Sequence, residues 1–167
     1  MNIALGQVLS TIAVGVGATL IMDLWAILLR RIANIPPPNY CFVGRWLRHM
    51  PDGIFRHDSI AAAPKKSAEC AVGWIAHYAI GVGFALLLVV LTSTQWLDEP
   101  TLLPAMTVGL ATVALPFCVM QPAFGLGLAS SRTPNPTQAR LRSLVNHAVF
   151  GIGLYISALA VSTVSNS

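Results

Sequence analysis

Four long stretches of apolar residues dominate the sequence, and each is long enough to cross the roughly 30 Å hydrocarbon layer of a membrane as a helix. They cover residues 3–29, 71–91, 101–123 and 143–164. The first stretch contains one charged residue, Asp23, and the other three contain no Lys, Arg, Asp or Glu. This pattern predicts an all-α, polytopic membrane protein with four transmembrane helices in a single domain over residues 1–167.

The segments that connect these stretches differ sharply in charge. All ten Lys and Arg residues lie in segments 30–70 and 124–142, whereas the short segment 92–100 carries only Asp98 and Glu99. Positive charge concentrates on the cytoplasmic side of membrane proteins, so the two basic segments are predicted to be inner loops. Segment 92–100 and both termini are then predicted on the outer side of a bacterial inner membrane.

Segment 30–70 is too long to be a bare turn. After three prolines that end the first helix, apolar residues recur at helical spacing with arginines between them, namely Phe42, Val43, Trp46, Leu47 and Met50. This pattern predicts a short interfacial helix in the headgroup layer. In the second basic segment, Asn135 and Pro136 favour a helix start ahead of the fourth apolar stretch.

Composition narrows the class of protein. Hydrophobic residues make up 55% of the chain and charged residues only 10%, and the mean hydropathy is +0.69. These values exclude a disordered regulator and a nucleic-acid-binding module, although the net charge is +4. The three scattered cysteines, Cys41, Cys70 and Cys118, are too few for a disulfide framework and are predicted to be free thiols.

Small and polar residues recur every four positions in three of the apolar stretches. Helices inside a bilayer associate through faces of this kind. The residues are Gln7, Thr11, Gly15, Thr19 and Asp23 in the first stretch, Gly73, His77, Gly81 and Ala85 in the second, and Ser143, His147, Gly151 and Tyr155 in the fourth. We expect these faces to point inward. The pattern His-x-x-x-Gly-x-Gly occurs at both His77 and His147, which indicates either two parallel helix-hairpin repeats or a coincidence.

Several short strings are spread along the chain: Gly15-Val16-Gly17-Ala18-Thr19, Met22-Asp23-Leu24-Trp25, Gly44-Arg45-Trp46, Phe55-Arg56-His57-Asp58-Ser59-Ile60, Gly73-Trp74-Ile75-Ala76-His77-Tyr78, Met120-Gln121-Pro122, Ser131-Arg132-Thr133-Pro134-Asn135-Pro136 and His147 to Tyr155. Together they resemble the bacterial membrane proteins grouped as domain of unknown function 2938. This resemblance covers nearly the whole chain. It implies predicted membrane spans but no assigned activity, so it transfers no catalytic residue.

Three ionisable residues lie within the apolar stretches at similar distances from the basic segments: Asp23, His77 and His147. A carboxylate with two imidazoles is a ligand set for zinc or non-haem iron, so these residues are candidate metal ligands. The two histidines are also candidate haem ligands, and all three residues are candidates for a substrate or proton site. The remaining alternative is that they only hydrogen-bond neighbouring helices.

The third apolar stretch contains Pro104, Pro116 and Pro122, so its inner half is predicted to be kinked or broken. Broken helices in membranes line cavities, because the freed backbone carbonyls need partners. Gln121 lies in this part of the stretch and is a further candidate for a substrate site. An ordinary proline kink without a cavity is the alternative.

The basic segments contain residues suited to bind anionic headgroups or phosphate. These candidates are Arg45, Arg48, Arg56, His57, Arg132 and Arg140. Charge that only sets the topology is the alternative explanation.

The sequence therefore favours an integral inner-membrane protein that binds or transports a small molecule or ion. Its predicted partners are a bilayer with anionic headgroups and further copies of itself. A membrane-embedded metal or haem enzyme acting on lipid or quinone, and a structural accessory subunit, are the alternatives. No nucleic acid partner is expected.

Overall fold

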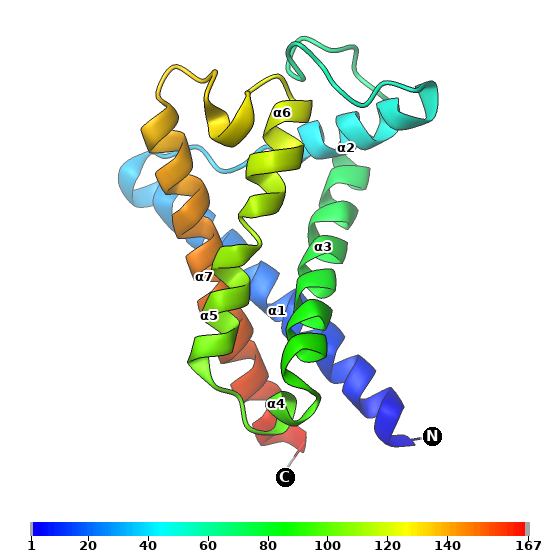
Figure 1. Ribbon diagram of the computed structural model, residues 1–167, viewed down its shortest axis with the longest axis vertical. Helices are drawn as coiled ribbons and strands as arrows, with labels where there is room; N and C mark the ends of the chain where they lie inside the picture. The colour runs from blue at the N-terminus through cyan, green and yellow to red at the C-terminus, as the bar shows by residue number, and fades with distance from the viewer. Residues whose placement is uncertain (1, 166–167) are drawn as a thin grey trace. The chain divides into compact units, whose positions relative to one another are not determined.

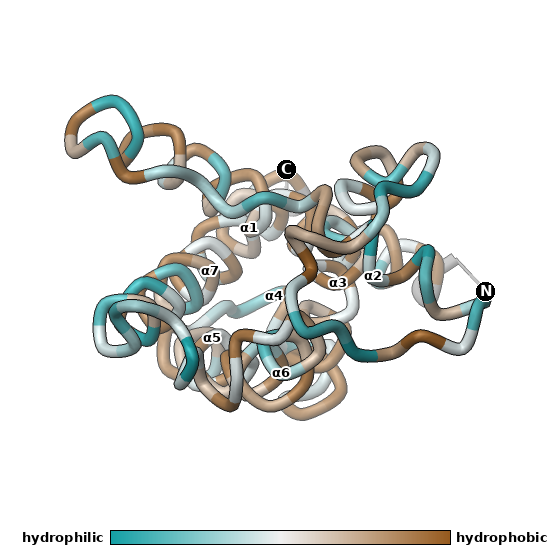
Figure 2. Tube along the Cα trace, turned by 90° about the horizontal axis from the view of Figure 1, so that it is seen from above, coloured by the Kyte–Doolittle hydropathy of each residue, from teal (hydrophilic) through white to brown (hydrophobic). Residues whose placement is uncertain are grey.

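The computed structural model describes residues 2–165, with side chains from 5 to 164. All regular secondary structure in this range is helical, as the sequence predicts. Four helical segments are long and apolar enough to cross a membrane, and they cover Leu5–Ala33, Glu69–Thr92, Leu102–Ala123 and Pro136–Val164. Figure 2 shows these segments as mostly hydrophobic tubes joined by more hydrophilic connections. The four predicted apolar helices are therefore confirmed.

The helices follow one another along the chain, with long connections between α2 and α3 and between α6 and α7 (Figure 1). They are α1 (Asn2–Ala33), α2 (Tyr40–His49), α3 (Glu69–Thr92), α4 (Gln95–Asp98), α5 (Leu102–Ala111), α6 (Gln121–Ala123) and α7 (Pro136–Ser165). Helix α2 occupies the place where the sequence predicts a short amphipathic helix. Its N-terminus is capped by Asn39, whose side-chain oxygen accepts a hydrogen bond from the Cys41 backbone N–H at 3.1 Å.

The third apolar segment is not one regular helix. Helix α5 ends at Ala111, a π-helical turn covers Pro116–Met120, and α6 follows as a single short turn. Pro116 and Pro122 have no backbone N–H to donate, so regular helical hydrogen bonding is interrupted at both positions. The prediction of a broken inner half is confirmed.

The chain divides into two compact units. The first unit contains Met1–Pro37, Tyr78–Ala111 and Asn146–Ser167, and the second contains Pro38–His77 and Thr112–Val145. The prediction of one domain over residues 1–167, and that of two helix-hairpin repeats, stay predictions.

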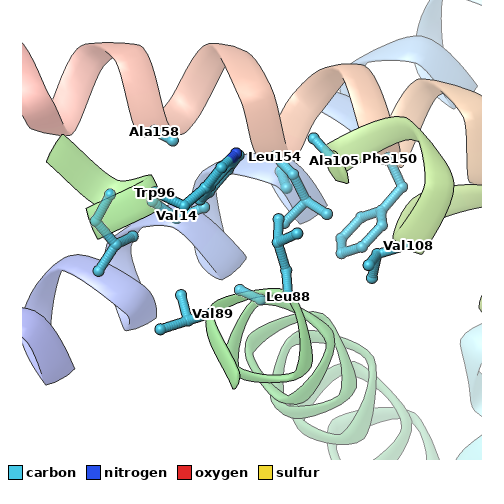
Figure 3. Close-up of a cluster of buried hydrophobic side chains, with 12 residues drawn as sticks. Val14, Leu88, Val89, Trp96, Ala105, Val108, Phe150, Leu154 and Ala158 are labelled. Atoms are coloured by element: carbon cyan, nitrogen blue, oxygen red, sulfur yellow. The ribbon is translucent and has the colours of Figure 1, made fainter. Parts of the chain in front are cut away.

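The core of the first unit is apolar and closely packed. Figure 3 shows its buried side chains, which include Val14, Leu88, Val89, Trp96, Ala105, Val108, Phe150, Leu154 and Ala158. Glycines allow the helices to approach: a Cβ atom on Gly15 would lie 2.5 Å from the Cα of Val82, and one on Gly109 would lie 2.5 Å from the Cα of Gly151. These contacts confirm that the faces with small residues point inward, which is expected of helices that associate inside a membrane.

The second unit is organised around the junction of α2 with the start of α3. A Cβ atom on Gly44 would lie 1.7 Å from the Glu69 carbonyl oxygen, so only glycine fits there. This close approach brings Cys41 and Cys70 together, and they form a disulfide bond. The prediction of three free thiols is therefore wrong for this pair, while Cys118 is a free, exposed cysteine.

Candidate functional site

Asp23 forms a polar contact between two helices of the first unit. Its side chain is 9% exposed, and its Oδ2 accepts a hydrogen bond from the Tyr78 hydroxyl at 2.9 Å. This bond joins α1 to α3, which is the arrangement expected of a polar contact that links helices. Tyr78 was not singled out as a site residue from the sequence, although it directly follows His77.

His147 also lies in the first unit, on α7. Its Nδ1 is 3.3 Å from the carbonyl oxygen of Gly109. A carbonyl can only accept, so Nδ1 carries the proton in this contact. The histidine thus joins α7 to α5 close to the point where Gly109 and Gly151 approach each other.

His77 belongs to the second unit, where it contacts aromatic rings. It is 9% exposed and stacks on Tyr40 with ring centroids 3.8 Å apart, while Trp74 meets it edge-on at 5.8 Å. Among the side chains that the structure describes, no group of three or more His, Cys, Asp or Glu residues could hold a metal ion. Metal or haem binding by Asp23, His77 and His147 stays a prediction.

Gln121 is buried in the second unit, with 5% of its surface exposed. Its Nε2 donates a weak hydrogen bond to the Ser143 hydroxyl at 3.4 Å, and its Oε1 has no hydrogen-bond partner among the described residues. It is not among the residues that line the pocket described in the next paragraph. Its role in a substrate site stays a prediction.

The second unit contains an open pocket of about 640 Å³. Its walls come from α2, from the loop after it, from the broken part of the third apolar segment and from the loop before α7. The lining residues are Trp46, Phe55, Arg56, Cys118, Val119, Pro122, Ala123, Gly127, Leu128, Ser131 and Arg132. The broken helix thus lines a cavity, as its prolines suggest, and the wall is mostly apolar with two arginines.

Backbone hydrogen bonds fix the loop that carries Arg56. The backbone N–H of His57 donates to the Ala123 carbonyl at 2.8 Å, and that of Ile60 donates to the Phe124 carbonyl at 3.1 Å. The Trp46 indole N–H donates to the Phe55 carbonyl at 2.9 Å. Arg56 is exposed and lines the pocket, while the backbone of its loop is held in place.

The loop that carries Arg132 has an unusual backbone. Gly125, Gly127, Ala129 and Ser130 all have positive φ angles, which strain the two residues that are not glycine. The Arg132 backbone N–H donates to the Leu126 carbonyl at 2.8 Å, and Arg140 donates from Nε to the Ala129 carbonyl at 2.8 Å. Arg140 therefore stabilises the loop that presents Arg132 to the pocket.

Arg45 has a structural role that the sequence does not reveal. It is 4% exposed and pairs with Glu69 through two bonds, from Nε at 2.9 Å and from an Nη at 2.7 Å. Its other Nη donates to three loop carbonyls, those of Ile60, Ala61 and Ala63. The hydrogen bond to Glu69 raises the pKa of Arg45. These donors are therefore used inside the unit, and anion binding by Arg45 stays a prediction.

Of the other basic candidates, Arg48 is exposed and lies outside the pocket lining. His57 is half-buried, and burial, helped by the positive charge of Arg45, lowers its pKa. The residues that sequence reasoning missed are Glu69 and the apolar wall of the pocket. Glu69 carried one signal: it is an isolated acidic residue where a basic segment meets an apolar one.

A family model described as a protein of unknown function (DUF2938) matches residues 12–161 of the chain. No curated protein matches the chain. No solved structure matches it either.

Proposed function

Because the chain belongs to the DUF2938 family, whose description assigns no activity, we propose a function from the pocket alone: the protein binds an anionic amphiphile, a molecule with an acidic head and an apolar chain. The observation that carries this proposal is that Arg56 and Arg132, one from each basic segment of the sequence, line the same mostly apolar pocket. The volume is in the range of small-molecule sites.

The two ends of such a molecule match different parts of the wall. Arg56 and Arg132 suit a phosphate or carboxylate, because guanidinium groups bind these anions with paired hydrogen bonds. Ser131 adds a hydroxyl donor at the same loop. The apolar chain would lie against Trp46, Val119 and the remaining apolar residues of the wall.

The four helices that are long and apolar enough to cross a membrane support a function in a membrane. We propose a bacterial inner membrane with the two basic segments on the cytoplasmic side and both termini outside, because the Lys and Arg residues occur only in those segments. The bilayer itself then supplies amphiphiles with acidic heads. Transport of the bound molecule would be a further step after binding at this site. Assembly of several copies of the chain is a separate part of the proposal.

Lipid binding to the purified protein tests the proposal. We expect native mass spectrometry in mild detergent to show retained phosphatidylglycerol in preference to phosphatidylcholine with identical chains. Each basic residue near an acidic surface contributes about 1 kcal/mol. The double variant Arg56→Gln, Arg132→Gln should therefore lose roughly 30-fold in affinity for phosphatidylglycerol.

The matched control is Arg48→Gln, Arg142→Gln, which removes the same charge from the same two segments outside the pocket. This control should retain nearly all of the affinity. Equal losses in the two double variants would show that only net charge matters, and the proposal would then be wrong.

A further inference from the structure

Two of the four histidines of the chain lie against each other in the second unit, outside the pocket lining. His49 is the last residue of α2, and His57 lies in the loop that follows. Their ring centroids are 4.9 Å apart with an angle of 72° between the ring planes. His49 is 4% exposed and His57 is half-buried. The function proposed above uses neither ring.

The hydrogen bonds of His49 determine which of its nitrogens is free. Its Nε2 lies 3.0 Å from the Pro64 carbonyl oxygen. A carbonyl only accepts, so the proton is on Nε2 and the lone pair of the neutral ring is on Nδ1. That Nδ1 is buried and has no hydrogen-bond partner among the described residues.

His57 offers a second buried nitrogen of the same kind. Its Nε2 also has no hydrogen-bond partner within the described part of the chain. A buried polar atom without a partner costs about 1–3 kcal/mol, so such atoms are rare and need an explanation. Two of them on adjacent imidazole rings indicate that something outside the protein chain completes the pair.

The surroundings of the pair resemble those of metal-binding histidines. A histidine that binds a metal normally donates its other N–H to a carbonyl or carboxylate, which fixes the ring and its tautomer. His49 makes such a bond to Pro64. The backbone of His57 is fixed as well, because its N–H donates to the Ala123 carbonyl.

The charged groups nearby are largely compensated. Arg45 is paired with Glu69 by two hydrogen bonds, and Lys66 is paired with Asp52. Arg48 next to His49, and Arg56 and Asp58 on either side of His57, are exposed. The buried groups of the pair that lack a partner are thus two imidazole nitrogens.

We propose that His49 and His57 bind a d10 metal cation, Zn²⁺ or Cu⁺, through Nδ1 of His49 and Nε2 of His57. Imidazole nitrogen suits both metals, and water or a small anion would complete the coordination of Zn²⁺. This site is separate from the metal ligands predicted from the sequence, Asp23, His77 and His147, because it uses the other two histidines.

Titration of the purified protein with Zn²⁺ alone, and with Cu⁺ under anaerobic conditions, tests the proposal by calorimetry. We expect one ion per chain. His49→Gln and His57→Gln should each weaken binding by about tenfold or more, whereas the matched controls His77→Gln and His147→Gln should bind as the unchanged protein does. Circular dichroism and gel filtration show which variants fold, and the two independent substitutions keep the test valid if one does not.

Three results would overturn the proposal. The first is that neither metal binds to the unchanged protein. The second is that binding survives both His49→Gln and His57→Gln in folded protein. The third is that binding is lost only in His77→Gln or His147→Gln, which would instead favour the site predicted from the sequence.

Discussion

The two units of the molecule are stabilised in different ways. In the first unit, glycines let helices touch, the core is mainly apolar, and hydrogen bonds such as that from Tyr78 to Asp23 join helices. In the second unit, a disulfide, a buried ion pair and backbone hydrogen bonds between loops hold the chain. Both use glycines at close contacts, and the buried ion pair of Arg45 with Glu69 belongs to the second unit.

This difference in stabilisation indicates which of the two units has space for a binding pocket. Helices that pack through small residues leave little space between them, because close contact is what stabilises them in lipid. Loops have backbone groups that need partners, and here Arg45 supplies donors for three loop carbonyls. The scaffold that results has room for a pocket and exposed arginines.

Breaking the ion pair of Arg45 with Glu69 should cause the largest loss of stability, and this loss should be confined to the second unit. Glu69→Gln leaves the Arg45 charge buried without its counter-charge, so we expect about 4 kcal/mol of lost stability. Unfolding by sodium dodecyl sulfate in mixed micelles measures it, with hydrogen exchange to locate the effect in the second unit. The exposed Arg48→Gln should change stability by less than about 0.5 kcal/mol. Equal effects of the two substitutions would refute the structural role of the pair.

The disulfide should come next in size. Replacing Cys41 and Cys70 by serine releases a loop of sequence separation 29, and we expect a loss of about 3 kcal/mol. The same unfolding assay measures this loss, and Cys118→Ser serves as the control because that thiol is free. If the unchanged protein and the double variant unfold alike, the disulfide does not form in the isolated protein.

A single methyl group tests the packing of the first unit. Gly15→Ala places a Cβ atom 2.5 Å from the Cα of Val82, so the helices must separate, and we expect about 2 kcal/mol of destabilisation. Gly83→Ala meets nothing within 4 Å. It should be neutral or slightly stabilising, since alanine favours helices. Similar outcomes for both substitutions would mean that the close approach is not real.

The smallest effect should come from the polar contact in the same unit. Tyr78→Phe removes the hydrogen bond to Asp23, and we expect about 1 kcal/mol of lost stability. Asp23→Asn should cost less, because the amide oxygen still accepts from the tyrosine. A larger effect of Asp23→Asn than of Tyr78→Phe would indicate that the carboxylate charge has a role beyond this bond.

The sequence was sufficient to predict where the helices lie along the chain, but not to predict which residues they bring into contact. Long apolar runs predicted the spans, and the prolines predicted the break in the third, because both signals are local. Asn135 and Pro136 likewise marked the start of α7. The pairing of Cys41 with Cys70 and of Arg45 with Glu69 depends on how α2 packs against α3, and no local signal reports that packing.

The candidate site was predictable in part for the same reason. Arg56 and Arg132 stood out as arginines in basic segments, and the structure places both in one pocket. Arg45 looked identical in the sequence but is buried, because Gly44 next to it brings α2 against the start of α3. Composition identifies charge, whereas burial decides which charges remain available to a ligand.

The most direct test of the proposed function uses Cys118, a free and exposed thiol in the wall of the pocket. We would measure its rate of labelling by a polar maleimide with and without phosphatidylglycerol. At a lipid concentration about ten times the dissociation constant, labelling should slow roughly tenfold, while phosphatidylcholine with the same chains should have little effect. Protection should be lost in Arg56→Gln, Arg132→Gln and kept in Arg48→Gln, Arg142→Gln. Labelling that is equally fast with both lipids would contradict binding of an anionic amphiphile in this pocket.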